Sequence, residues 1–247
     1  MAGDFELVDL RTEIADAAQR KALCEAFYAD VYRDAFPKAD QVETPKVWLP
    51  LLNADLPPPA PILHLIVARH RSGGEMDGAV VAGLVIEYFR RSRVALVTYI
   101  AVAPDYRRQG LGGQMLAKAV QKVSKDNGGV RPLIVAEVER PDAQNSEAAR
   151  KAAHGRLAIM AALGGKRLDF SYIQPKLSLD QNAVTDLMLV ALGSAGVAGG
   201  GVPSSTVRAF LEEFFSSLDQ PESEDLNVAI ESLPAGSVSL KDLHDYG

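Results

Sequence analysis

The sequence has 247 residues, and 47% of them are apolar, which is enough to bury a substantial core. Its single cysteine, Cys24, cannot form an internal disulfide, and the four histidines lack the spacing of metal ligands, so we expect no metal site. The longest apolar stretches are too short to cross a bilayer, and the acidic N-terminus does not resemble a signal peptide. Composition therefore predicts a soluble, cytoplasmic protein.

The net charge of −6 is unevenly distributed along the chain. From Ala191 to Gly247 there are two basic and nine acidic residues, so this tail alone carries −7 and the first 190 residues carry about +1. Nucleic-acid binding needs a basic face, and an acidic polar surface is repelled by anionic lipid. We therefore expect neither a nucleic acid nor a membrane as partner.

The N-terminal third is expected to be helical. Its first helix should end before Pro37, and a second short helix should run from about Pro45 to Leu52. Apolar residues share one stripe of the first helix, namely Ile14, Ala18, Leu23, Phe27 and Val31. Three segments rich in Val, Ile and Leu follow and are joined by short polar turns. These segments, Ile62–Arg69, Ala79–Phe89 and Val94–Val102, are expected to form an antiparallel meander.

The pattern changes after Ala103, where a polar, glycine-rich turn leads into a helix expected from Gln114 to Ser124. Its inward residues are expected to be Met115, Leu116, Val120 and Val123. The strand Leu133–Glu139 would complete a βαβ crossover with two parallel strands. A helix from about Ser146 to Leu163 and strands near Lys166–Phe170 and Thr185–Ala191 follow. These elements predict an α/β body with a mixed sheet.

The C-terminal region reads as an extension of this body. Residues Gly193 to Gly201 are mostly glycine, alanine and serine, which favours a flexible link. Apolar residues from Val207 to Leu218 then recur at helical spacing and predict an amphipathic helix. We expect this helix to pack on the chain's own body, with exchange between two subunits as the alternative. The predicted organisation is a domain over 1–192 and an extension over 193–247, in a monomer or homodimer.

The segment that points to chemistry is the turn between the strand ending at Val102 and the following helix. Glycines at Gly110, Gly112 and Gly113 let the backbone approach a ligand and adopt positive φ. Successive N–H groups and the helix N-terminus can then converge on an anion. The turn therefore predicts a phosphate-binding site, although its spacing fits neither a nucleotide triphosphatase loop nor a dinucleotide fingerprint.

The pattern that does fit is Arg-x-x-Gly-x-Gly, formed by Arg107, Gly110 and Gly112 after the strand sequence Tyr-Ile-Ala-Val. This motif resembles the pyrophosphate-binding motif of the GNAT superfamily of acetyl-CoA-dependent N-acetyltransferases. The order of elements from about Phe5 to Leu192 is also similar to the GNAT order. The resemblance implies a GNAT-like acyl-CoA N-acyltransferase fold with a C-terminal helical extension, and acetyl-CoA as the cofactor.

The resemblance also implies roles for residues of this segment. Backbone N–H groups from Arg108 to Gly113 would hold the pyrophosphate of CoA, and the strand from Ile100 to Val102 would bind the pantetheine and polarise the thioester carbonyl. The implied cofactor-binding residues are Ile100, Val102, Arg107, Arg108, Gln109, Gly110, Leu111, Gly112 and Gly113. A row of lysines on the next helix, Lys118, Lys122 and Lys125, could add positive charge for the cofactor or form an ordinary solvated face.

Two side chains that many GNAT enzymes use in catalysis are replaced here. Met160 stands where a tyrosine acid is common, before Leu163-Gly164, and Leu96 stands where some members carry a glutamate base. Three catalytic candidates remain, namely Glu137, Tyr172 and Tyr99.

Glu137 shares a strand face with Glu139 and could take a proton through water. Alternatively, either glutamate could lie in solvent at the strand end or pair with Arg140. Tyr99 could protonate the leaving thiolate or belong to the core. Tyr172, in a Tyr-x-Gln-Pro segment, could line the acceptor pocket.

The sequence and the resemblance together predict an N-acetyltransferase that moves acetyl from acetyl-CoA to a primary amine of a small molecule or peptide by direct attack. Because the usual acid and base are missing, the alternative is a GNAT-fold module that binds acyl-CoA without turnover. A third possibility is a partner-binding protein whose acidic tail docks on a basic surface.

Overall fold

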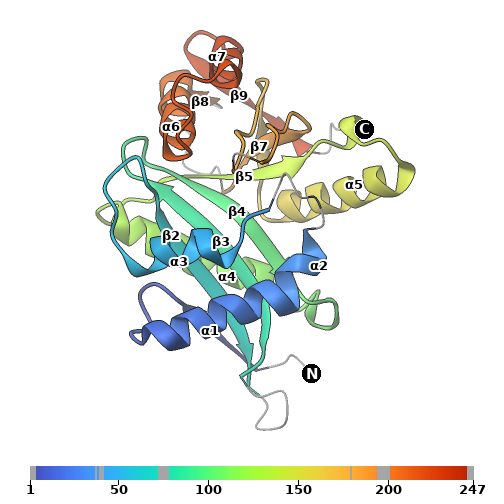
Figure 1. Ribbon diagram of the computed structural model, residues 1–247. Helices are drawn as coiled ribbons and strands as arrows, with labels where there is room; N and C mark the ends of the chain where they lie inside the picture. The colour runs from blue at the N-terminus through green and yellow to red at the C-terminus, as the bar shows by residue number, and fades with distance from the viewer. Residues whose placement is uncertain are drawn as a thin grey trace. The chain divides into compact units, whose positions relative to one another are not determined.

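The computed structural model describes residues 4–36, 38, 42–71, 78–178, 180–193 and 201–243 (Figure 1). The chain divides into two compact units, and each is described by itself. Unit 1 comprises Met1–Tyr88 and Val97–Pro132, and unit 2 comprises Phe89–Leu96 and Leu133–Gly247. Within the described residues, no helix is long and apolar enough to span a membrane.

Unit 1 contains four strands in the order β1-β2-β3-β4. Strand β1 was not predicted, and it pairs antiparallel with β2, placing Asp9 opposite Ile66. Strands β2 and β3 are antiparallel, as the sequence predicts, with a register shift at Ala68/Arg69. The strand bounds are β1 Phe5–Asp9, β2 Ile62–His70, β3 Val80–Phe89 and β4 Val94–Val102, with Phe89 and Val94–Leu96 counted in unit 2.

The first helix of unit 1 begins three residues after Ile14, because Asp16 caps it by accepting hydrogen bonds from the N–H groups of Ala18 and Gln19 at 2.7 and 3.2 Å. Ile14 lies outside the helix and is buried in the core. The helices of the unit are α1 Ala17–Phe27, the π-helical turn η1 Tyr28–Tyr32, α2 Arg33–Ala35, α3 Pro45–Asn53, the 3-10 turn η3 Pro104–Tyr106 and α4 Leu111–Asp126.

Helix α4 packs against β1 and β2 with a narrow apolar stripe. The buried residues lie four apart, at Leu111, Met115, Ala119 and Val123. The expectation that Leu116 and Val120 also point inward was wrong, because both are only half-buried. The stripe follows a single i, i+4 row, and the neighbouring face is partly open to solvent.

Unit 2 contains strands in the order β5-β7-β6-β9-β8, and each neighbouring pair in this order is antiparallel. The predicted strand Leu133–Glu139 is confirmed as β5, whereas β6 ends earlier than expected, at Leu168, and β7 begins later, at Leu187. The remaining bounds are η4 Pro141–Ala143, α5 Glu147–Ala162, β6 Lys166–Leu168, β7 Leu187–Ala191, β8 Gly201–Pro203, α6 Ser204–Ser217, α7 Glu224–Glu231 and β9 Ser237–Asp242.

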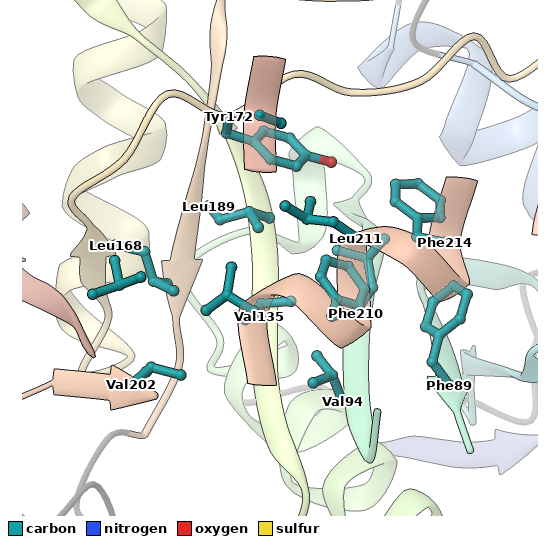
Figure 2. Packing of buried hydrophobic residues seen from close by; sticks show 14 of the residues in the cluster. Phe89, Val94, Val135, Leu168, Tyr172, Leu189, Val202, Phe210, Leu211 and Phe214 are labelled. Carbon is teal, nitrogen blue, oxygen red and sulfur yellow. The ribbon is translucent and has the colours of Figure 1, made fainter. Parts of the chain in front are cut away.

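The amphipathic C-terminal helix α6 packs on the body of unit 2, as expected. Its rings Phe210 and Phe214 contact Phe89 edge-to-face with centroids 5.5 and 5.6 Å apart, in a cluster that includes Val135 and Leu189 (Figure 2). Strands β8 and β9 and helix α7 were not predicted, and β9 pairs with β6. Most of the proposed link, residues 194–200, lies outside the described residues, so the division at 192/193 stays a prediction.

Buried Glu213 fixes α6 to the turn between β3 and β4. Its carboxylate accepts hydrogen bonds from the backbone N–H groups of Arg91 and Ser92 at 3.1 and 2.8 Å. The sequence of the turn alone, Arg-Arg-Ser-Arg, gives no sign of this acceptor. The apolar stripe and this one buried carboxylate together set where the helix docks.

Candidate active site

The glycine-rich turn of unit 1 agrees only in part with its sequence prediction: Gly110 has a positive φ, but helix α4 begins at Leu111 rather than Gln114, so Gly112 and Gly113 lie inside the helix and have ordinary negative φ. Strand β4 ends at Val102, the 3-10 turn η3 follows, and Gly110 caps helix α4 in the left-handed region with φ 78° and ψ 4°. Arg108 also has a positive φ, 61°, which is uncommon for a residue with a Cβ atom. Two left-handed residues within three positions turn the chain sharply into the helix.

The start of α4 presents backbone donors without competition from side chains. The N-cap residue Gly110 has no side chain that could cap the helix, and the first turn of α4 carries no acidic residue. The first N–H groups of a helix have no intrahelical acceptor, and the helix dipole adds partial positive charge there. Exposed Arg107 and Arg108 add full charges. These features favour an anion at the turn, and anion binding there stays a prediction.

The turn also lies close to the end of β4. A Cβ atom on Gly112 would come 3.4 Å from Cδ1 of Ile100, and Nε of Arg107 donates to the carbonyl of Val102 at 3.0 Å. All nine residues expected to bind the cofactor thus lie on one continuous strand-turn-helix segment. Their contact with CoA stays a prediction.

The lysines of α4 serve the structure of unit 1. Lys118 Nζ donates to the carbonyl of Leu7 and to Glu13, both at 2.7 Å. Lys122 Nζ donates to Thr12 at 2.7 Å and to Glu13 at 2.8 Å. Their charges are balanced by the turn that follows β1, so the interpretation of these two lysines as cofactor ligands is not supported by their contacts.

The same region holds a buried network that sequence reasoning missed. Nδ1 of His64 lies 2.9 Å from Asp9 and Nε2 lies 2.7 Å from Asp126, and both His64 and Asp9 are at most 1% exposed. Burial alone would lower the pKa of His64, but the hydrogen bonds with Asp126 and Asp9 raise it above its usual value. The ring of His64 bridges two carboxylates, one on β1 and one at the end of α4.

The pKa of Asp9 shifts in the opposite direction, downward. Burial would raise the pKa of this carboxyl, but hydrogen bonds from His64 and Thr12 hold it below its usual value. These residues are spread over three elements far apart in the sequence, so no spacing rule could have brought them together. Within the described residues, no group of three or more metal-ligating side chains occurs.

Tyr99 lies in an aromatic cluster of unit 1 and is 4% exposed. Its ring packs edge-to-face against Tyr32 at 4.9 Å and Phe36 at 5.2 Å. Buried Glu43 joins the cluster by accepting from Trp48 Nε1 at 2.9 Å, and burial raises the pKa of its carboxyl. The contacts of Tyr99 place it in the core, and its role as an acid stays a prediction.

In unit 2, the structure brings together two of the catalytic candidates. The hydroxyl of Tyr172 donates to Oε1 of Glu137, and the amide of Gln174 donates to Oε2 of the same carboxylate at 2.9 Å. Glu137 lies on β5, whereas Tyr172 and Gln174 belong to the segment between β6 and β7. The Tyr-x-Gln spacing places both donors on one side of an extended chain, which is why one carboxylate can accept from both.

The two donors of this cluster differ, because the Tyr172 hydroxyl acts as a donor, whereas the Gln174 amide also carries an acceptor. Burial, followed by the negative charge of Glu137, holds the pKa of the Tyr172 hydroxyl well above its usual value, so this hydroxyl remains a donor. The Gln174 side chain is 97% buried, and its Oε1 has no hydrogen-bond partner among the described residues. Because a carboxylate can only accept, Nε2 must face Glu137 and Oε1 must be the acceptor left over.

The charged residues next to Glu137 form ion pairs, and the two residues that stand in place of the usual acid and base are buried. Glu139 forms an ion pair with Arg156 of α5, and Arg140 pairs with Asp142 at 2.8 Å. Leu96 is buried in the core of unit 2, and Met160 is buried on α5. The sequence interpretation that Glu139 is structural is thus supported by a contact, although its ion-pair partner on α5 was not foreseen.

A comparison with protein-family models decides the family. The model described as the acetyltransferase (GNAT) family matches residues 25–153, which are 129 of the 247 residues. The chain belongs to the GNAT acetyltransferase family. The protein is therefore an acetyl-CoA-dependent acyltransferase, and the fold expected from its sequence is confirmed. A comparison with curated proteins finds no match.

Solved structures with the GNAT fold are similar to this chain. A Bacteroides thetaiotaomicron protein assigned to the family as an acetyltransferase is 15% identical with a TM-score of 0.53, covering 87% of this chain and 98% of that one. The ribosomal-protein-S18-alanine N-acetyltransferase from Escherichia coli is 18% identical with a TM-score of 0.40, covering 76% and 93%. At 15% identity the likeness to the Bacteroides thetaiotaomicron structure concerns the fold alone.

Proposed function

We propose that this GNAT protein transfers acetyl from acetyl-CoA to a primary amine by direct attack, with Glu137 as the general base. The observation that carries the proposal is the hydrogen-bonded cluster of Glu137, Tyr172 and Gln174. A carboxylate held by two donors keeps one orientation, which a base needs before it can accept a proton. Tyr172 and Gln174 are positioning residues in this account.

The turn of unit 1 fits the pyrophosphate of the acetyl donor. Gly112 leaves room for close approach beside Ile100, and the uncapped start of α4 supplies N–H donors from Leu111 to Gly113. When bound, acetyl-CoA supplies an activated acetyl thioester. The exposed Arg107 and Arg108 would neutralise the charge of its phosphates.

The buried Oε1 of Gln174 supports an amine as the acceptor. A primary ammonium has three N–H donors, and a buried acceptor without a partner is costly until such a donor reaches it. In our proposal the ammonium donates one hydrogen bond to Glu137, which removes that proton, and a second hydrogen bond to Oε1 of Gln174. Because the hydroxyl of Tyr172 donates its proton to the hydrogen bond with Glu137, the departing group would leave as a thiolate and take its proton from bulk solvent.

The second candidate is a module that binds acyl-CoA without turnover. Two observations favour it, since buried Leu96 and Met160 occupy positions where relatives carry a base or an acid. The glycine turn would serve this function equally well. A fold does not guarantee a reaction, so the two candidates must be separated by experiment.

Free-thiol release from acetyl-CoA in the presence of a panel of primary amines separates the two functions. We expect release that depends on the amine and on the enzyme concentration. Calorimetric titration with CoA provides the matched control, because both candidates predict binding. Tight CoA binding with no thiol release above background for any amine would contradict the transferase and support the sensor.

A further inference from the structure

A cavity opens in unit 2 where β6 leaves β7. The ladder between these strands covers only Lys166 opposite Ala191 and Arg167 opposite Val190. After Leu168 the chain turns toward β9, where the N–H of Asp169 donates to the carbonyl of Ser239 at 3.0 Å. The first residues of β7 therefore have β5 on one side and, on the other, a cavity of about 370 Å³, the size of a small-molecule pocket.

The register of β5 and β7 shows which backbone groups face that side. The N–H of Arg140 donates to the carbonyl of Asp186, and the N–H of Leu192 donates to that of Ile134, at 2.8 and 2.9 Å. Hydrogen-bonded pairs alternate in an antiparallel ladder, so even-numbered residues of β7 bond to β5. Leu187, which lines the cavity, consequently directs its N–H and C=O away from β5 and toward the cavity side.

The polar lining of the cavity comes from residues on or next to three elements. Arg140 follows β5, Arg167 lies on β6, and Asp169 follows β6, whereas the hydroxyl of Ser232 comes from the end of α7. Arg167 is paired with Asp169 at 3.0 Å, and Arg140 is paired with Asp142 at 2.8 Å. A guanidinium has five donors in a planar fork and can serve two carboxylates at once. Two arginines at one cavity favour an anionic group.

Tyr172 connects this cavity to the proposed base. Tyr172 is one of the residues that line the cavity, and its hydroxyl donates to Glu137. Figure 2 shows the ring in the apolar cluster that also contains Leu189 and Leu211. One side chain is thus shared by a cavity with arginines and by the carboxylate to which we assign proton removal.

We propose that the cavity binds the carboxylate of the acetyl acceptor, so that the acceptor is a small amine that also carries a carboxylate, as an amino acid does. This inference rests on the proposed function and names its substrate class. Arg140 and Arg167 hold the carboxylate, and the backbone N–H of Leu187 is a further donor on the same side.

Matched pairs of amines test the proposal. Each amino acid is compared with its carboxamide, which keeps the amine and removes the negative charge, and thiol release from acetyl-CoA gives kcat and KM. The wild type should prefer the acid at least 10-fold. Arg140→Gln and Arg167→Gln should each raise the KM of the acid about 10-fold to 100-fold, as expected for a lost charge-assisted hydrogen bond, with little change for the amide.

Two further variants separate recognition from general charge or stability. Arg167→Lys keeps the charge but loses the fork, so it should recover only part of the preference. Arg208→Gln removes an exposed positive charge from α6, away from the cavity lining, and should leave the preference unchanged. A variant that merely weakened the fold would affect acid and amide alike.

The inference and the proposed function fail in different ways. If amines are acetylated but acids and amides react equally well, or if both glutamine variants keep the wild-type preference, the cavity is not the carboxylate site. If no amine is acetylated, the proposed function fails, and calorimetry with the amino acids alone decides the inference. Binding that Arg167→Gln abolishes would support the cavity, and no binding would overturn it.

Discussion

The glycine turn of unit 1 and the Glu137 cluster of unit 2 use different chemical groups, namely backbone N–H groups in the turn and side chains in the cluster. The turn offers backbone N–H groups, exposed to solvent and shaped by Gly110 and Gly112. The cluster offers side chains, held by hydrogen bonds in a largely buried setting. The comparison teaches that substitutions should affect the two regions differently: the turn is sensitive to any added Cβ atom, whereas the cluster is sensitive to a change of single atoms in a carboxylate or amide.

The largest effect is expected from Glu137→Gln. This change keeps the shape of the side chain and removes the base, so turnover should fall about 10²-fold, the usual loss on removing a general base. Thiol release measured across pH should show the greatest loss on the rising, acidic limb of the profile. Glu139→Gln is the matched control, because Glu139 pairs with Arg156 and should not move protons.

The affinity for CoA, measured by calorimetry, should be unchanged in Glu137→Gln and in Glu139→Gln. Equal turnover of Glu137→Gln and wild type at every pH would return Glu137 to a structural role. An equal loss in both glutamine variants would point to a general weakening of β5.

Substituting the two glycines should separate strain from obstruction. Alanine at Gly110 must adopt φ near 78°, which costs about 1–2 kcal/mol of folding stability because the left-handed region disfavours a Cβ atom. Alanine at Gly112 meets only an ordinary contact with Ile100 at 3.4 Å, so stability should hold. Its methyl group should instead obstruct the pyrophosphate and weaken acetyl-CoA binding about 10-fold, a loss of about 1.4 kcal/mol.

Thermal melting and calorimetry of both variants check this contrast. Unchanged acetyl-CoA affinity in Gly112→Ala would mean that the turn is not the phosphate site. An unchanged melting temperature in Gly110→Ala would show that the turn can relax its left-handed residue at no cost.

The buried histidine should make unit 1 sensitive to alkali. The pKa of His64 is raised on folding, so its contribution to stability is complete below its unfolded value of about 6.5 and is lost as pH rises through the higher folded value. Asp9 shifts downward, so its contribution is lost only as pH falls below its usual acidic range. Melting temperatures of wild type and His64→Gln should converge above neutral pH, and a constant difference would refute the charged bridge.

The smallest effect is expected from Lys122→Met. Its ion pair with Glu13 is partly exposed, so stability should fall by no more than about 1 kcal/mol. Acetyl-CoA affinity at low salt should not change, since the ammonium is directed to the turn after β1. A clear loss of affinity would restore Lys122 as a cofactor ligand and blur the distinction between backbone and side-chain recognition.

The sequence predicted what depends on neighbours along the chain. The turn from Val102 to Leu111 combines a strand end, a positive-φ glycine at Gly110 and a helix start, and all of these are local, so most of its conformation could be foreseen. The pairing of Glu137 with Tyr172 joins residues 35 apart, and each was singled out for a separate reason. Gln174 was visible only as part of a Tyr-x-Gln-Pro segment, and its hydrogen bond to Glu137 required the fold.

Other features left no local signal. Strand β1 is short and was hidden in a segment whose next residues suggested a helix, and His64 looked like an ordinary strand residue because its carboxylate partners are 55 and 62 positions away. The docking of α6 was predicted because a wide apolar stripe must be buried somewhere. The partner strand β9 could not be predicted, because its pairing with β6 depends on long-range contacts.

The central claim is that the turn binds the cofactor and the Glu137 cluster performs the proton transfer. The most direct measurement compares Gly112→Ala and Glu137→Gln for two quantities, the Kd of acetyl-CoA and the single-turnover rate of acetyl transfer at saturating cofactor. The account predicts that Gly112→Ala weakens the Kd and leaves the rate unchanged, whereas Glu137→Gln lowers the rate and leaves the Kd unchanged. Two variants that alter the same quantity would contradict it.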